Sequence, residues 1–214
     1  MSEAAANTPV YDLGTSGRFV KEMGLVRHLF EDATYRAGGY QPDLTLGADS
    51  CDFDCDIQNL SDIADCAAGS VVCLSVLEHV LHPERAVREI YRILRPAGLA
   101  IVSVPFLITY HGKSNRCSNP VFEQRKDWQP DSNHNGYGDF WRFTHEGLAY
   151  LFAKAGFSRV DVYPTDGWLI SRLHLLNLYH PIQRLPFLGG LIARLDRPNL
   201  GRTTTMHFVR AEKG

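Results

Sequence analysis

Two histidines have the residue type and the setting for proton transfer. His79 follows Leu77 and Glu78 at the end of one apolar run, and His111 lies in a polar segment behind another. An imidazole titrates near neutral pH, so either ring could take a proton from an acceptor hydroxyl or amine. The alternatives are structural: His79 could belong to the start of a helix, and His111 could be a surface-loop residue.

The metal-binding residue types form no complete ligand set. Asp52, Asp54 and Asp56 alternate and would share one face of an extended segment, but no second group of ligands accompanies them. The five cysteines are odd in number and include no CxxC pair, which favours free thiols in a reducing compartment over a zinc site or a disulfide framework. We therefore expect no metal.

The composition is that of a soluble globular protein with one sizeable core, 44% hydrophobic and 21% charged over 214 residues. A net charge of −2 without a basic run argues against nucleic acid and favours a small-molecule partner. No run of about 18 apolar residues is present, so we expect no membrane span. The N-terminal MSEAAANTP lacks the pattern of a signal peptide, and we expect a cytoplasmic protein.

Two short apolar runs flank an amphipathic helix. The runs GSVVCLSV (69–76) and LAIVSVPF (99–106) are continuous and rich in β-branched residues, which indicates buried strands. Between them, Pro83 and Glu84 suit the first turn of a helix that ends at residues 95–98. This βαβ order predicts a parallel sheet covered by helices on both faces.

The same patterns predict the other elements. Thr144 can cap a helix over 145–155 that ends at Gly156. The remaining expectations are strands at 9–14, 42–49, 159–165 and 203–211, the last at an antiparallel edge, and a helix at 19–37 that Gly38-Gly39 would end.

Two segments interrupt the pattern of what we expect to be a single domain over residues 1–214. Residues 107–139 form a polar insertion, and a loop of that length in a compact domain is usually functional or mobile. Residues 167–195 are apolar and predicted to be helical. They could pack in the core, form a homodimer contact, cover an acceptor or lie on a membrane surface, and the first two are the preferred expectations.

Two blocks of the sequence resemble the class I S-adenosylmethionine-dependent methyltransferases. VVCLSVLEHVLHPERAVREIYRILRPAGLAIVSVPF (71–106) resembles a subgroup with an LEHV, R-x-L-x-P-x-G and SVP signature, and DFWRFTHEGLAYLFAKAGFSRVDV (139–162) resembles its downstream block. The resemblance implies a Rossmann-like α/β fold with a mostly parallel seven-stranded sheet, helices on both faces and an antiparallel edge strand. It places S-adenosylmethionine at the carboxyl ends of the strands, as is general for open α/β sheets.

The resemblance also implies which residues bind this cofactor. Asp49 matches the acid that binds the ribose at the tip of the second strand. Asp56 and Ile57 match the positions beside the adenine, and Leu74 and Ser75 face the methionine end. Some relatives bind a divalent metal with a Glu-x-x-Glu-His set, in which Ser75 here replaces the first Glu.

The first glycine motif of the family has one candidate here, residues 12–17, with Asp12, Gly14 and Gly17 as binding residues. An ordinary N-terminal turn is the alternative. Gly69 stands where the family has an acid at the start of the fourth strand.

The leading hypothesis is methylation of an oxygen or nitrogen of a small molecule, such as a sugar or specialised metabolite. His111 and His79 are the candidate catalytic residues. The departures from the family pattern leave two alternatives open: a non-methylating reaction such as a cyclisation, and a catalytically silent binding subunit.

Overall fold

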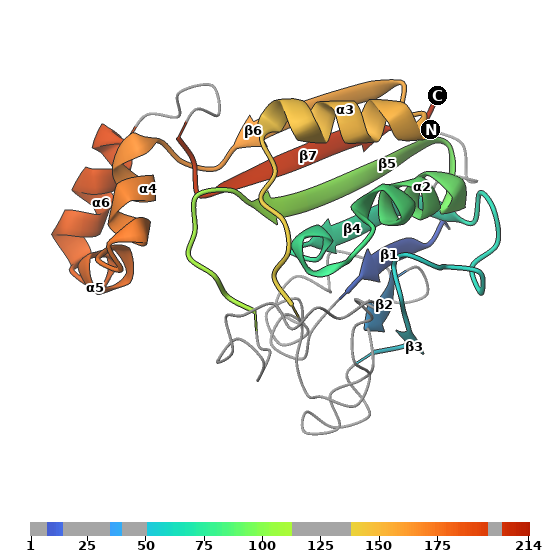
Figure 1. Cartoon of the computed structure of the whole chain (residues 1–214), viewed down its shortest axis with the longest axis horizontal. Helices are drawn as coiled ribbons and strands as arrows, with labels where there is room; N and C mark the ends of the chain where they lie inside the picture. Colours follow the sequence, from blue (N-terminus) through green and yellow to red (C-terminus); the bar gives the residue numbers. More distant parts are fainter. Residues whose placement is uncertain (1–7, 15–34, 40–50, 113–137, 197–202) are drawn as a thin grey trace, which may run out of the picture.

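One seven-stranded sheet organises the described residues, which are 8–14, 35–39, 51–112, 138–196 and 203–214 of a computed structural model. The strands are β1 (Val10–Leu13), β2 (Tyr35–Gly39), β3 (Phe53–Asp54), β4 (Ala68–Leu74), β5 (Leu94–Pro105), β6 (Arg159–Pro164) and β7 (Met206–Glu212). They lie in the order β3-β2-β1-β4-β5-β7-β6 (Figure 1). The first five pair in parallel, and β7 is antiparallel to both β5 and β6. The sheet is therefore Rossmann-like and mostly parallel, as predicted.

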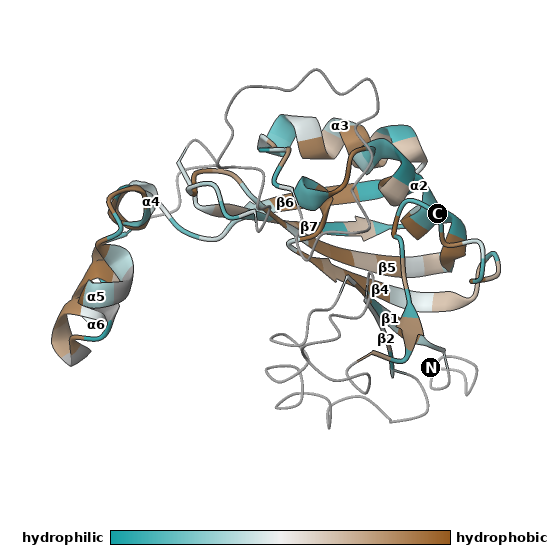
Figure 2. Ribbon diagram, turned by 60° about the horizontal axis from the view of Figure 1, so that its bottom comes forward, coloured by the Kyte–Doolittle hydropathy of each residue, from teal (hydrophilic) through white to brown (hydrophobic). Residues whose placement is uncertain are grey.

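Two helices, α2 (Pro83–Ile93) and α3 (His145–Ala155), cover one face of this sheet. They lie side by side in both views (Figures 1 and 2) and contact each other. The apolar stripe of α2 and the facing residues of α3 are fully buried and form the centre of the core with β4 and β5. These residues are Val71, Cys73, Ala86, Val87, Ile90, Ile93, Val102, Leu148 and Phe152.

The helix ends follow from local chemistry. Pro83 occupies the first turn of α2, where its missing N–H leaves no backbone donor unpaired. The Thr144 side chain accepts a hydrogen bond from the Gly147 N–H at 3.1 Å and so caps α3. Gly156 ends α3 with a φ of 112°, a conformation that favours glycine. The predicted bounds of α3 and its two caps are confirmed.

The position of the second strand was not predicted. β2 occupies Tyr35–Gly39, where the apolar spacing suggested the end of a helix over 19–37 and a stop at Gly38-Gly39. The segment has no β-branched residue, and its strand conformation comes from parallel pairing with β1 between Tyr35 and Val10. The rest of that helix and the predicted strand at 42–49 lie outside the described residues.

The C-terminal strand is antiparallel, as predicted, but it is not at the edge. β7 lies between β5 and β6, so the antiparallel edge is the β6–β7 pair and β6 is the outermost strand. The alternating pattern of β7 arises because one of its faces is buried. His207, Val209 and Ala211 are buried, whereas Phe208 between them is exposed.

Residues 167–195 form what we call the helical arm. It contains α4 (Trp168–Leu175), α5 (Tyr179–Gln183) and α6 (Pro186–Leu195), which contact one another and lie apart from α2 and α3 beyond the ends of β6 and β7 (Figures 1 and 2). The expectation that the arm packs in the core is wrong for most of its large apolar residues, which are exposed. No helix in the described ranges is long and apolar enough to cross a membrane.

Gly14 ends β1 in a conformation that other residues adopt only with strain. Its φ is +82°, and a Cβ there would lie 2.5 Å from Cγ2 of Val76. We expect Gly14→Ala to lower the free energy of unfolding by about 2 kcal/mol, measured by urea denaturation.

Gly190 in α6 provides the matched control for that measurement. Nothing lies within 4 Å of a Cβ at this position. Gly190→Ala should therefore leave the unfolding free energy unchanged or raise it by up to about 1 kcal/mol. Equal stability of Gly14→Ala and the unmodified chain would contradict the tight approach of Val76.

Candidate functional site

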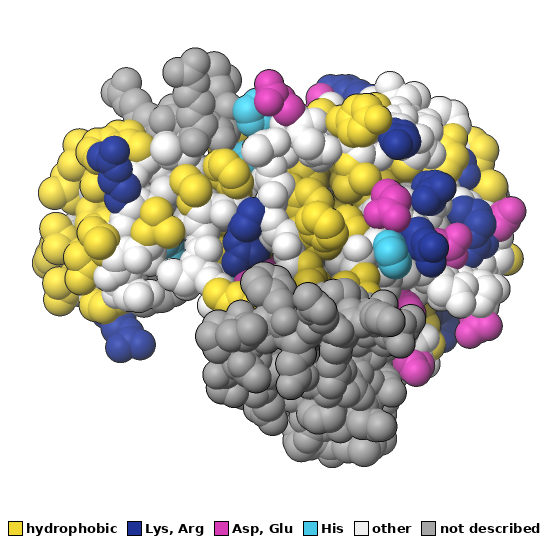
Figure 3. Space-filling view, viewed as in Figure 1, with side chains coloured by type: hydrophobic (Ala, Val, Ile, Leu, Met, Phe, Trp, Pro, Cys, Tyr) yellow, Lys and Arg dark blue, Asp and Glu magenta, His cyan; other side chains and the backbone are white. Residues whose placement is uncertain are grey.

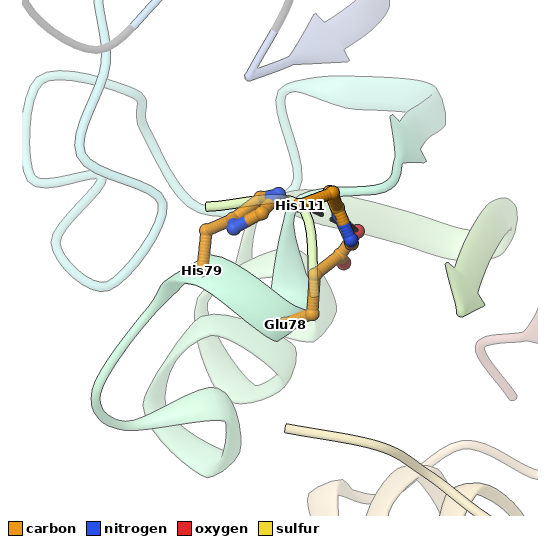
Figure 4. Close-up of side chains that lie close together, drawn as sticks. All are labelled: Glu78, His79 and His111. Atoms are coloured by element: carbon orange, nitrogen blue, oxygen red, sulfur yellow. Dashed lines mark ion pairs between the residues drawn. The ribbon is translucent and has the colours of Figure 1, made fainter. Parts of the chain in front are cut away.

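Glu78, His79 and His111 meet at the carboxyl ends of two neighbouring strands, and we call them the His–Glu–His cluster (Figure 4). Glu78 and His79 belong to η3 (Leu77–His79), a single helical turn behind β4, and His111 follows β5. Because β4 and β5 are parallel, the residues behind both strands reach the same edge of the sheet. The Nε2 atoms of His79 and His111 each lie 3.6 Å from Oε1 of Glu78.

The ring nitrogens on the other side of each imidazole already face acceptors. Nδ1 of His79 lies 2.5 Å from the carbonyl oxygen of Gly138, and Nδ1 of His111 lies 3.2 Å from Oδ2 of Asp139. This network assigns the proton of each neutral ring to Nδ1, which leaves an unprotonated Nε2 facing Glu78. Three electron-pair donors therefore converge, and a proton or another cation between them would relieve their repulsion.

The Glu78 carboxylate is the most strongly constrained group of the cluster. Its side chain is 0% exposed, and neither oxygen has a hydrogen-bond partner among the described residues. The separation of 3.6 Å from each histidine nitrogen is longer than a hydrogen bond. Burying a charge without a partner is costly, and such groups are found preferentially at functional sites.

The segment 139–144 holds the cluster from the other side. The Phe140 N–H donates to the Glu78 carbonyl oxygen at 2.7 Å, and Nε1 of Trp141 donates to the Val80 carbonyl oxygen at 2.8 Å. The two sequence blocks that carry the family resemblance are thus in direct contact. These contacts give Trp141 a structural role.

Asp139 is a candidate site residue that the sequence analysis missed. Its side chain is fully buried and accepts hydrogen bonds from both Nη atoms of Arg142 and from the His111 N–H at 3.0 Å. Asp139 thereby fixes the ring of His111 through Nδ1, as a carboxylate orients a catalytic or metal-binding histidine. Its position at the start of the DFWRFT block was the one available signal.

The environment shifts the pKa values of the two histidines in opposite directions. Burial lowers the pKa of His79, against the attraction of Glu78. The Glu78 carboxylate raises the pKa of His111, with Asp139 adding to the effect. Burial raises the pKa of Asp139, but the hydrogen bonds from Arg142 and His111 outweigh it and hold the pKa below its usual value. His111 is therefore the ring that takes a proton more readily.

The strand order reverses between β1 and β4, and the carboxyl ends of these strands are where the resemblance places the cofactor. Gly14, Leu74 and Ser75 are at these ends, and Ser75 has a φ of 55°. Asp12 lies in β1, two residues before Gly14, and is buried, where its carboxylate accepts a hydrogen bond from the Tyr35 hydroxyl. Gly14, Leu74 and Ser75 thus lie at the strand ends where the resemblance places the cofactor, whereas Asp12 already has a protein partner.

The other predicted cofactor residues either have protein contacts of their own or lie outside the described residues. Asp56 Oδ1 accepts hydrogen bonds from the backbone and side chain of Gln58 at 2.9 and 3.2 Å. Ile57 is 2% exposed and belongs to the core. Gly17 and Asp49 lie outside the described residues.

A pocket of about 310 Å³ opens beside His111. Thr109 lines it from the segment behind β5, and His174, Asn177 and Tyr179 line it from the helical arm. The wall offers hydroxyl, amide and imidazole groups, which suits a polar acceptor. Covering an acceptor was one of the alternatives that the sequence left open for residues 167–195, and the arm does line this pocket.

A family model described as a methyltransferase domain matches residues 31–102, which include β2 to β4, η3, α2 and most of β5. No curated protein has significant sequence similarity to the chain. The match includes β4, which precedes the His–Glu–His cluster, and the cluster residues Glu78 and His79. His111 lies outside the match.

Solved methyltransferase structures share the fold. A possible histamine N-methyltransferase of Thermotoga maritima has a TM-score of 0.56 at 17% identity, covering 96% of this chain and 82% of that one. Phosphoethanolamine N-methyltransferase 2 of Haemonchus contortus, in complex with phosphomonomethylethanolamine and S-adenosylhomocysteine, has a TM-score of 0.54 at 13% identity. That match covers 97% of this chain and 49% of the other, so the chain spans about half the length of this neighbour.

The [4+2]-cyclase SpnF also has the fold, with a TM-score of 0.53 at 18% identity over 97% of this chain and 74% of that one. At such identities the neighbours establish the fold and not the reaction. The family match to a methyltransferase domain covers residues 31–102, and the solved structures share the fold over nearly the whole chain.

Proposed function

We propose that the chain transfers a methyl group from S-adenosylmethionine to an oxygen or nitrogen of a small molecule, with His111 as the general base. The observation that carries the proposal is the convergence of His111, His79 and the Glu78 carboxylate, to which no described residue donates a hydrogen bond, at the carboxyl edge of the parallel sheet. S-adenosylmethionine supplies an electrophilic methyl group on a sulfonium, and methyl transfer then depends mainly on alignment and on removal of the acceptor proton.

His111 has the contacts that a base requires. Asp139 holds its Nδ1–H, so Nε2 is free to accept the proton of the acceptor group. The imidazolium that forms lies 3.6 Å from Glu78, whose negative charge stabilises it. His79, with its lowered pKa, stays neutral and does not compete with His111 for the proton.

The predicted cofactor residues enter the proposal with the roles that the resemblance implies. Leu74 and Ser75 would meet the methionine end through their backbone at the end of β4. Asp56 would meet the adenine amino group through Oδ2, to which no described residue donates, and Ile57 would pack below the ring. The roles of Asp49 with the ribose and of Asp12, Gly14 and Gly17 in the first glycine motif are part of the same proposal.

A divalent cation is a second candidate occupant of the cluster, and the sequence analysis expected none. Among the described residues, one carboxylate oxygen and two imidazole nitrogens lie within 4.8 Å of one another. The second contacts of both rings, to Gly138 and Asp139, match those of metal-binding histidines. A bound cation would polarise an acceptor hydroxyl, and Glu78, His79 and His111 would hold it.

Metal titration of the full chain tests this second candidate. If a cation binds, Mn²⁺ should raise the thermal unfolding temperature of the unmodified chain in a saturable manner. Glu78→Gln keeps the shape of the side chain but removes its charge, and should abolish the increase. Asp62→Asn, a change of an exposed acid outside the cluster, is the matched control and should leave it intact. If neither Mn²⁺ nor Zn²⁺ changes the unfolding temperature, a divalent cation is excluded as the occupant of the cluster. A proton then remains as the group shared by Glu78 and the two histidines.

A further inference from the structure

The helical arm has an apolar outer surface. Every leucine that is exposed in the described part of the chain belongs to it, and Phe187 at the start of α6 is 93% exposed. Figure 3 shows these hydrophobic side chains gathered over the arm. A continuous exposed apolar surface of this kind marks an interaction site. The exposed leucines are Leu175, Leu176, Leu178, Leu185, Leu188, Leu191 and Leu195.

The charges of the arm all have one sign. Arg172, Arg184 and Arg194 are exposed, and residues 167–195 contain no aspartate or glutamate. The whole chain, by contrast, has a net charge of −2. The arm is therefore a local cationic region, and its partner should carry negative charge.

The base of the arm is fixed to the sheet, so the arm is a defined structure rather than an unattached segment. Asp196, at the end of α6, accepts hydrogen bonds from the N–H groups of Gly167, Leu169 and Ile170 at 2.5, 2.9 and 3.2 Å. This carboxylate satisfies the free donors at the start of α4 and closes the arm into a loop. Asp166 adds a hydrogen bond from the Thr205 N–H at 2.8 Å.

We propose that the helical arm binds the surface of an anionic lipid bilayer. Short helices with exposed Phe and Leu beside arginines, and without acids, have the composition of segments that lie in the membrane interface. A contact between two arms of identical copies would bring arginines against arginines with no acid in either arm to pair with them. This charge pattern favours a lipid surface over the homodimer contact that the sequence suggested.

Binding at a membrane would also place the pocket beside His111 close to that surface, because His174, Asn177 and Tyr179 of the arm line it. The proposal itself does not rest on methyl transfer. Its test needs neither a methyl donor nor an acceptor, so the two proposals can fail separately.

Sedimentation with lipid vesicles tests the proposal. The full chain should bind vesicles of phosphatidylcholine mixed with phosphatidylglycerol, and the bound fraction should fall as sodium chloride screens the charges. Phe187→Ser should lower the partition coefficient roughly tenfold, because one exposed aromatic side chain no longer enters the interface. Arg184→Gln should lower it on anionic vesicles only. Tyr150→Ser is the control, since Tyr150 is 66% exposed on α3 outside the arm.

Equal binding of vesicles with and without phosphatidylglycerol would overturn the proposal, as would the absence of binding to both. Sedimentation velocity adds a third decisive outcome. A stable dimer that Phe187→Ser dissociates would assign the arm to a contact between copies of the chain.

Discussion

Replacing His111 by glutamine should lower the rate of methyl transfer roughly 10²- to 10⁴-fold and leave the affinity for S-adenosylmethionine unchanged. The reason is the placement of His111 between Asp139 and Glu78: the first holds the Nδ1–H, and the second stabilises the charge that arises when Nε2 takes a proton. Glutamine keeps a polar side chain at this position but cannot accept and hold that proton. Single-turnover rates with a panel of hydroxyl and amine acceptors would measure the effect, and calorimetric titration would measure cofactor affinity.

The pH dependence separates a base from a structural residue. Since Glu78 raises the pKa of His111 above its ordinary value, the neutral form that acts as a base increases as the pH rises above 6.5. The rate should therefore rise over that range in the unmodified chain, and His111→Gln should lose this dependence. His82→Gln removes an exposed histidine and is the matched control. A fully active His111→Gln variant would refute the assignment of the base.

His207 should make the fold sensitive to acid. Its ring is fully buried in β7, with no hydrogen-bond partner on either nitrogen among the described residues, and packs near Phe106 and His145. Burial, with a further contribution from His145, lowers its pKa to about 4. In the unfolded chain the group titrates near 6.5, so the folded state resists taking up the proton.

The direction of the effect follows from the lowered pKa. The contribution of a neutral His207 to stability is fully present above pH 6.5 and is lost as the pH falls through 6.5 towards 4. The loss amounts to at most about 3 kcal/mol, which is a large part of the stability of a single domain. Urea denaturation between pH 7 and pH 4 should therefore show a smaller decline in the free energy of unfolding for His207→Gln than for the unmodified chain. The control His82→Gln should show the same decline as the unmodified chain. Parallel declines in all three proteins would contradict the prediction.

Most of the fold could be predicted because local chemistry and tertiary structure agree. The runs that became β4 and β5 are continuously apolar, and Thr144 and Gly156 mark the ends of α3 by side-chain and backbone geometry. β2 could not be predicted in this way, since the residues Tyr35–Gly39 include two glycines and no β-branched residue and depend on pairing with β1. The order of β6 and β7 could not be predicted either. The alternation of apolar and polar residues along β7 indicates that one of its faces is buried, but it does not indicate whether the strand lies at the edge of the sheet.

The site was predictable only in part. His79 and His111 follow two strands that the βαβ order makes neighbours, and their meeting is a consequence of that order. Asp139 comes from a segment far along the chain, and its buried contacts with His111 and Arg142 are a tertiary property. His207 was missed because a single histidine in an alternating strand does not reveal on which face it lies.

Calorimetric titration of the full chain with S-adenosylmethionine, and separately with S-adenosylhomocysteine, tests the central claim most directly. The reversal of strand order between β1 and β4 predicts saturable binding of both compounds with one site per chain. Failure of both to bind would contradict the assignment of a methyltransferase and would leave only the shared architecture.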